Sequence, residues 1–200
     1  MAKRRYRKPY LDSGVFIAWI KGEVIKQKDA NGVEVIVDRG KIGESILTWA
    51  ESRAYPIIIS TLTLVEVHKK KGKEKLEADE NQNVLDYFQH DFVNPVIIDR
   101  SIGEEANRLC RLHEDQKLSP CDAIHLACAK KAGCDVLLTW DDGLVGIADP
   151  AIRIERPEMQ EIPLEPLSEG ETPEDQQQLP FEDGEDSGEP QKEENESGQI

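Results

Sequence analysis

Residues 119–142 read SPCDAIHLACAKKAGCDVLLTWDD, and this stretch decides the fold class. Residues 119–132 predict a helix, and residues 136–139 form a short apolar run that predicts a buried strand. Asp122 falls in the first turn of that helix, and Asp141 follows the strand directly. A helix that leads into a buried strand is typical of a parallel α/β sheet, whose ligands gather beyond the carboxyl ends of its strands.

Strand-forming and helix-forming segments alternate along most of the remaining chain. The expected strands cover residues 7–11, 56–59, 96–98, 136–139 and 152–155. The expected helices cover about 15–20, 42–53, 61–70, 74–90, 102–114, 119–132 and 142–148. The apolar run 56–59 suits a strand that is buried on both faces, and Ser13 is placed to cap the first helix. The alternation therefore predicts an α/β fold with a central, mostly parallel sheet and right-handed crossovers.

Two segments stand apart from this alternation. Residues 22–40 look like an insertion, and the hairpin turn signal Asn31-Gly32 within it predicts a small β-ribbon. Residues 165–200 contain 13 acidic residues and a single lysine, a composition that cannot bury enough apolar surface to offset chain entropy. We therefore expect a folded domain at 1–164 and a disordered acidic C-terminal tail at 165–200.

The formal net charge of −15 belongs mostly to this tail, which contributes −12 and leaves the domain nearly neutral. The charge therefore does not argue against a nucleic-acid partner for the domain. Basic residues crowd the N-terminus and the segment after Glu66, and both clusters could contact phosphates. The candidate RNA-binding residues are Arg4, Arg5, Lys69, Lys70 and Lys71. Solvated charges that serve only solubility explain either cluster equally well.

The four cysteines form no CxxC pair, which argues against a disulfide framework and favours reduced thiols in the cytoplasm. The spacings Cys110-x2-His113 and Cys121-x3-His125 allow a weaker zinc hypothesis. Against it, a free cysteine is commonly a core residue, and His125 falls on an apolar helical face. No signal peptide or membrane span is visible, because the basic start is followed only by the short apolar run 15–20.

Four acidic residues lie where their neighbours are apolar or helix-forming: Asp12, Glu66, Asp122 and Asp141. A carboxylate next to a buried face must be paired, protonated or bound to a cation, because desolvating an isolated charge is costly. Each close pair would oppose folding by roughly 4 kcal/mol at about 4 Å and an effective dielectric of about 20. The pattern therefore indicates a divalent cation, and oxygen ligands without a histidine or cysteine cluster suit Mg²⁺ or Mn²⁺.

Each of these acids also has a purely structural explanation. Asp122 completes a capping box with Ser119, with proline at the first helical position. Asp12 could simply start a helix, and residues 141–143 could form an ordinary turn. Glu66 fits such an explanation least, because apolar residues surround it and no helix terminus lies close enough to use its charge.

Three segments, YLDSGVFIAW (10–19), STLTLVEV (60–67) and SPCDAIHLACAKKAGCDVLLTWD (119–141), resemble the PIN domain of VapC-type toxin ribonucleases. The resemblance spans about residues 8–155 and implies a three-layer α/β/α sandwich. It also implies a metal-dependent endoribonuclease that hydrolyses phosphodiester bonds of RNA, and the toxin of a toxin–antitoxin pair. The catalytic, metal-binding residues would be Asp12, Glu66, Asp122 and Asp141, supported by Ser13, Thr139 and Asp142.

The chain departs from that pattern at Gly14, where a second small polar residue is common, and in its insertion and acidic tail. One alternative is a non-catalytic PIN-like module that binds RNA or a protein. A phosphatase of the Asp-x-Asp type is a weaker alternative, because the second residue after Asp12 is glycine. The expected partners are single-stranded RNA, an antitoxin protein and a second copy of the chain as a homodimer, with no membrane partner.

Deleting residues 165–200 is expected to raise the affinity for RNA, because a polyanionic tail competes with phosphates for the basic residues. The gain should be largest at low ionic strength, where charges are screened least. Fluorescence anisotropy of a labelled single-stranded RNA, titrated with full-length and truncated protein at low and high salt, measures the effect. Equal affinities would leave the tail as a solubilising or docking segment.

Overall fold

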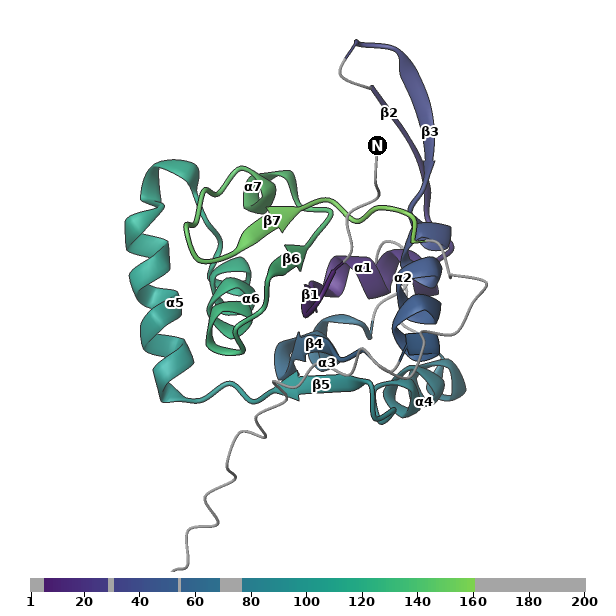
Figure 1. Ribbon diagram of the computed structural model, residues 1–200, viewed down its shortest axis with the longest axis horizontal. Coiled ribbons are helices and arrows are strands. Elements are labelled where there is room, and N and C mark those ends of the chain that lie inside the picture. Colours follow the sequence, from purple (N-terminus) through teal and green to yellow (C-terminus); the bar gives the residue numbers. More distant parts are fainter. Residues whose placement is uncertain (1–5, 29–30, 54, 69–76, 161–200) are drawn as a thin grey trace, which may run out of the picture. The chain divides into compact units, whose positions relative to one another are not determined.

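A five-stranded parallel sheet forms the centre of the computed structural model, which describes residues 6–28, 31–53, 55–68 and 77–160 (Figure 1). The strand order is β5-β4-β1-β6-β7, and every neighbouring pair is parallel. The strands are β1 (Pro9–Leu11), β4 (Ile57–Ser60), β5 (Val93–Val96), β6 (Val136–Leu138) and β7 (Arg153–Glu155). The parallel sheet predicted from the alternating segments is confirmed.

Helices cover both faces of this sheet, with α1, α2 and α4 on one side and α5 and α6 on the other (Figure 1). The longer helices are α1 (Ser13–Ile20), α2 (Arg39–Arg53), α4 (Ala78–Tyr87), α5 (Arg100–Leu112) and α6 (Pro120–Lys131). The shorter ones are α3 (Thr61–Glu66), η1 (Glu114–Gln116) and α7 (Asp142–Val145). The three-layer α/β/α architecture is therefore also confirmed.

Strand residues alternate between two hydrophobic cores, one on each face of the sheet. In β4, Ile57 and Ile59 join the core under α1 and α2, whereas Ile58 joins the core under α5 and α6. In β1, Leu11 and Tyr10 divide in the same way. Because successive side chains of a strand point to opposite faces, a run of apolar residues is what a doubly covered strand requires. Each fully buried isoleucine stabilises the fold by about 1.5–3 kcal/mol.

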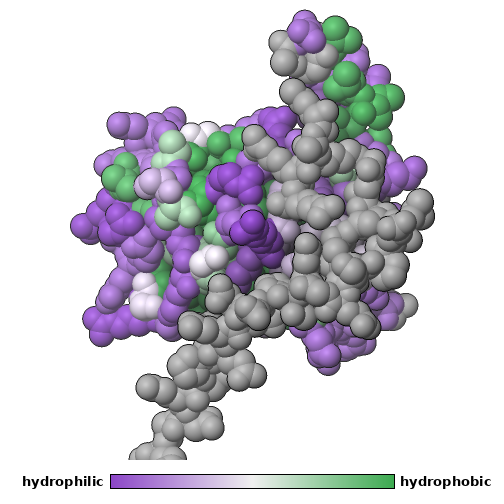
Figure 2. Space-filling view, viewed as in Figure 1, coloured by the Kyte–Doolittle hydropathy of each residue, from purple (hydrophilic) through white to green (hydrophobic). Residues whose placement is uncertain are grey.

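The insertion forms an antiparallel ribbon of β2 (Val24–Lys28) and β3 (Glu34–Asp38), as predicted. In Figure 1 the ribbon extends away from the three layers. Among the described strands, β2 and β3 form hydrogen bonds only with each other. Apolar side chains are exposed along it, with Val24 57% and Ile36 71% exposed. These residues contribute to the hydrophobic surface seen on the ribbon in Figure 2.

The base of the ribbon is held by close contacts to the start of α2. The amide of Gly40 donates to the carbonyl of Glu23 (3.0 Å), and Arg39 pairs with the Glu23 carboxylate (3.2 Å). The guanidinium of Arg39 also lies 4.7 Å from the ring centroid of Trp140, a cation–π contact. The ribbon is thus tied to the segment that follows β6.

Two local predictions were wrong. The strand expected at 96–98 lies instead at Val93–Val96, and Ile97 is 72% exposed. Pro95 is tolerated there because β5 is an edge strand, where a missing backbone N–H costs no ladder hydrogen bond. The N-cap of α1 is Asp12 rather than Ser13, which is the first helical residue.

Other predictions concern parts of the chain that the structure leaves undescribed. The candidate RNA-binding residues and the acidic tail lie outside the described residues, so the predictions about them stay predictions. The helix expected at 61–70 ends at Glu66 within the described part. Among the described helices, none is long and apolar enough to cross a membrane.

Replacing Gly40 with alanine is expected to lower the free energy of unfolding by about 1–3 kcal/mol, a typical cost of overpacking. The added Cβ would lie 2.8 Å from the Cα of Gly22, and backbone atoms cannot give way as a flexible side chain can. Gly103→Ala is the matched control, because its Cβ would meet nothing within 4 Å inside α5.

The control should raise the free energy of unfolding by about 0.5–1 kcal/mol, the ordinary gain of alanine over glycine in a helix. Urea unfolding of the two variants beside the unmodified protein measures both effects. Equal changes in the two variants would show that the backbone around Gly22 can move to accommodate a Cβ at position 40.

Candidate active site

The three central strands end at one edge of the sheet, and the candidate site lies just beyond it. Leu11 at the end of β1 is in register with Leu138 at the end of β6. The amide of Asp12 continues this pairing by donating to the carbonyl of Leu138 (3.1 Å). Asp12 and Thr139 therefore leave neighbouring strands side by side, as expected for the carboxyl edge of a parallel sheet.

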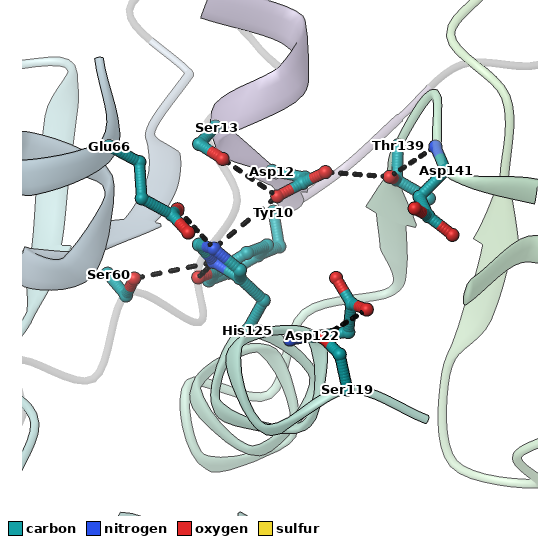
Figure 3. A network of polar contacts seen from close by, with 10 residues as sticks. All are labelled: Tyr10, Asp12, Ser13, Ser60, Glu66, Ser119, Asp122, His125, Thr139 and Asp141. Carbon is teal, nitrogen blue, oxygen red and sulfur yellow. Dashed lines mark hydrogen bonds and ion pairs between the residues drawn. The ribbon is translucent and has the colours of Figure 1, made fainter. Parts of the chain in front are cut away.

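Asp12 is held by hydroxyl groups on both of its carboxylate oxygens (Figure 3). Thr139 Oγ1 donates to Asp12 Oδ2 (2.7 Å), and Ser13 Oγ donates to Asp12 Oδ1 (3.3 Å). Thr139 Oγ1 also accepts from the amide of Asp141 (3.0 Å). With an exposed fraction of only 6%, Asp12 is the most buried of the four acids. Ser13 and Thr139 thus contact the acid that they were expected to support.

Glu66 and Asp12 meet at the imidazole of His125 (Figure 3). Glu66 is the last residue of α3, and its Oε2 lies 2.9 Å from His125 Nε2. Asp12 Oδ1 lies 3.4 Å from the same nitrogen. One ligand atom from each of these three residues lies within 4.8 Å of the other two. In the part of the chain that the structure describes, this is the one group of at least three such residues close enough to hold a metal ion.

The charges in this group shift the pKa values of His125 and Glu66 in opposite directions. Burial lowers the pKa of His125, but the hydrogen bond with Glu66 and the charges of Asp12, Glu66 and Asp122 outweigh burial, so the pKa is raised. Burial raises the pKa of Glu66, but the hydrogen bond and charge of His125, together with Ser13, hold it below its ordinary value. Both shifts favour a cationic imidazole between two carboxylates.

Asp122 makes the capping contact considered for it and is also affected by the charges of other acids. Ser119 is the N-cap of α6, and its Oγ accepts from the amide of Asp122 (3.2 Å) and donates to Asp122 Oδ2 (2.6 Å). The capping contact is therefore present. Burial raises the pKa of Asp122, the hydrogen bond from Ser119 lowers it, and the charges of Asp141 and Asp12 raise it further. Asp122 thus also shares an electrostatic environment with two of the other acids.

Asp141 and its neighbour Asp142 face different partners. Asp141 is the N-cap of α7, and its Oδ1 accepts from the amide of Leu144 (3.0 Å). Asp142 pairs with Arg156 and its side chain is 75% exposed. Since it is Asp141 whose charge acts on Asp122, Asp141 is the better placed of the two to join the acidic group.

The zinc hypothesis is wrong, because its four residues do not come together as a group among the described residues. His113 Nδ1 lies 2.9 Å from the side-chain oxygen of Gln116, and Cys121 is exposed. All four cysteines are free, and burial raises the pKa of the Cys128 and Cys134 thiols to about 12.

His125 is the residue whose role the sequence analysis missed. It was considered only as a zinc ligand or as part of an apolar helical face, whereas the structure places it against Glu66 and Asp12. Its spacing of three residues from Asp122 was the available signal, because residues i and i+3 lie on the same side of a helix.

Comparison with known proteins is consistent with this architecture. The family model of the PIN domain matches residues 33–150, more than half of the chain. The chain belongs to the PIN domain family. The matched range includes Glu66, Asp122 and Asp141, and it begins after Asp12. The resemblance to PIN domains predicted from the sequence motifs is confirmed.

The solved structure of a toxin has a similar fold. The crystal structure of Mycobacterium tuberculosis VapC20, a sarcin-ricin loop cleaving toxin, matches with a TM-score of 0.52 and 14% sequence identity. The match covers 72% of this chain and 98% of the VapC20 chain. At this identity the likeness establishes a shared fold alone. A comparison with curated proteins gives no match.

Replacing Asp122 with asparagine is expected to raise Tm in the presence of EDTA by about 2–4 °C, which corresponds to about 1 kcal/mol of repulsion removed. Asparagine keeps an oxygen that can accept from Ser119, so the capping contact survives. The rise in Tm that Mg²⁺ or Mn²⁺ produces should become smaller, because one ligand charge is lost.

Asp91→Asn is the control, because Asp91 is exposed in the turn before β5. Thermal unfolding gives the Tm of the unmodified protein, Asp122→Asn and Asp91→Asn with EDTA and with each metal. A lower Tm for Asp122→Asn in EDTA would mean that the charged capping contact outweighs the repulsion.

Proposed function

We propose that the protein is a metal-dependent endoribonuclease that uses Asp12, Glu66, Asp122 and Asp141 to hold Mg²⁺ or Mn²⁺. The observation that supports this most is the approach of Asp12 and Glu66 at the carboxyl edge of the central strands, where their carboxylates offer ligand atoms within 4.8 Å of each other. The charges of Asp141 and Asp12 act on Asp122 at the same edge. Membership of the PIN domain family supports the same proposal.

The chemistry of the donor set fits a hard divalent cation. Carboxylate oxygens are the ligands that Mg²⁺ and Mn²⁺ prefer. Burial raises the pKa of Asp122, and the charges of Asp141 and Asp12 add to this effect. Glu66, Asp12 and Asp122 raise the pKa of His125 against its burial, so the group carries concentrated negative charge. A divalent cation would neutralise that charge without requiring a carboxylate to be protonated.

The protein's own residues would fix the geometry of the site. Thr139 and Ser13 each hold one oxygen of Asp12, which restricts the carboxylate to one orientation. Two hydrogen bonds hold Asp141: its backbone amide donates to the Thr139 hydroxyl, and its carboxylate accepts from the amide of Leu144. A bound Mg²⁺ or Mn²⁺ ion would lower the pKa of a water molecule and stabilise charge on the leaving oxygen of a phosphodiester.

Single-stranded RNA is the proposed substrate. Contacts to such a strand are mostly electrostatic, and Arg4, Arg5 and Lys69–Lys71 are the proposed phosphate contacts. VapC20, which shares the fold, is a toxin that cleaves the sarcin-ricin loop, and this supports an RNA substrate and a toxin role with an antitoxin partner. We extend the proposal to a cytoplasmic location, which the four free cysteines support, and to a homodimer.

One observation favours a second candidate, a PIN-like module that binds RNA or protein without catalysis. His125 already lies between Asp12 and Glu66, and a cationic imidazole would stabilise two carboxylates without any metal. Metal binding separates the two candidates, because only the nuclease requires it.

Cleavage of labelled single-stranded RNA by the purified protein is expected with Mg²⁺ or Mn²⁺ and not with EDTA. Asp12→Asn should reduce the rate by more than about 100-fold, beyond the 10–100-fold typical of residues that contact a metal ligand without binding the metal. The loss is expected because Asp12 is the central and most buried acid of the group.

Asp91→Asn again serves as the control and should cleave at the rate of the unmodified protein. A fully active Asp12→Asn protein would contradict the proposed metal site. Metal binding without cleavage in either protein would point to a masked or substrate-restricted enzyme, and absence of metal binding would favour the non-catalytic module.

A further inference from the structure

Among the four histidines, all of which the structure describes, His125 alone is buried, with an exposed fraction of 1%. Both of its ring nitrogens have partners. On one side, Nδ1 lies 2.7 Å from the hydroxyl of Tyr10 and 3.4 Å from that of Ser60. On the other side, Nε2 lies 2.9 Å from Glu66 Oε2 and 3.4 Å from Asp12 Oδ1. The imidazole therefore connects the central strands to the acidic pair.

The direction of these hydrogen bonds follows from what each partner can donate. An ionised carboxylate only accepts, so the nitrogen that faces Glu66 and Asp12 must carry the proton. Burial raises the pKa of Tyr10 well above its ordinary value, so its hydroxyl stays protonated and can donate to Nδ1 or accept from it. The proton on Nε2 is thus required whether the imidazole is neutral or charged.

In the observed geometry the Nε2–H is directed at Glu66, so His125 acts on the site through the carboxylates. Glu66 carries a long side chain that is partly exposed and sits at the end of a short helix. Fixing such a side chain costs conformational entropy, and the like charge of Asp12 opposes the arrangement further. The hydrogen bond from Nε2 offsets both costs at once.

We propose that His125 is a positioning residue, whose Nε2–H holds Glu66 beside Asp12 as a preformed pair of oxygen ligands. Tyr10 and Ser60 hold the ring itself, so three neighbouring elements, β1, β4 and α6, orient one carboxylate of a fourth, α3. This inference rests on the proposed metal-dependent function. Groups that orient metal ligands in this way typically change metal affinity or activity by 10–100-fold when replaced.

Two substitutions at His125 separate positioning from packing. In His125→Gln the side-chain amide nitrogen reaches about where Nε2 lies and can still donate to Glu66. In His125→Asn the amide reaches only the Nδ1 position, so contact with Tyr10 survives and contact with Glu66 is lost. Both variants have uncharged, polar side chains. If His125 served only packing or general polarity, the two variants would bind Mn²⁺ with similar affinities.

The measurement is Mn²⁺ affinity of the full-length protein by isothermal titration calorimetry, with circular dichroism to establish folding. His125→Gln should bind Mn²⁺ within about threefold of the unmodified protein, and His125→Asn about 10–100-fold more weakly. Tyr10→Phe leaves every acid and the imidazole in place, and it should weaken Mn²⁺ binding by several-fold because the ring loses its closest partner. This third variant keeps the test informative if a substitution at His125 prevents folding.

Pulsed electron paramagnetic resonance of the Mn²⁺-loaded protein provides a second readout. No coupling to an imidazole nitrogen is expected, and such a coupling would overturn the inference by making His125 a direct ligand. Equal weakening in the Gln and Asn variants would also overturn it, as would unchanged affinity in both His125→Asn and Tyr10→Phe.

Failure of the proposed function is distinguishable from failure of this inference. If the pattern of Mn²⁺ affinities holds while the unmodified protein cleaves no RNA, only the ribonuclease proposal falls. If the unmodified protein binds no Mn²⁺, the preformed ligand pair and the proposed metal site fall together.

Discussion

The parallel pairing of β4, β1 and β6 is the constraint on which the rest of the structure depends. These strands end together, so the residues that follow β1 and β6 and the helix that follows β4 begin at one edge. Asp12, Glu66 and Asp141 come from those three continuations, and α6 adds Asp122 because it begins at the same edge before it leads into β6. Residues far apart in the chain thus converge at one edge of the sheet.

This convergence has an electrostatic cost, which neighbouring polar groups reduce. The hydroxyl groups of Thr139 and Ser13 donate to Asp12, and that of Ser119 donates to Asp122. His125 lies between the carboxylates of Asp12 and Glu66. Each group acts on a particular oxygen, so neutralisation and orientation come from the same contacts. Burial, and after it the charges of Asp141 and Asp12, keep the pKa of Asp122 raised despite its hydrogen bond to Ser119.

Much of the fold and part of the site could be predicted from the sequence because both depend on short-range patterns. The apolar run 56–59 indicates a doubly buried strand, and an acid directly after a strand indicates the edge at which a ligand site is expected. The spacing of His125 from Asp122 indicates a shared helix side, but its contact with Glu66 joins α6 to α3, which no local pattern specifies. The edge strand was misplaced for a related reason: residues 96–98 are apolar, but pairing with β4 ends at Val96.

The contact between Arg39 and Trp140 has a mechanical consequence. Trp140 lies between Thr139, which holds Asp12, and Asp141, which caps α7. Arg39 lies immediately after the second strand of the ribbon. A displacement of the ribbon base would therefore reach the backbone between Thr139 and Asp141 through the Trp140 ring, although the ribbon and that segment share no strand.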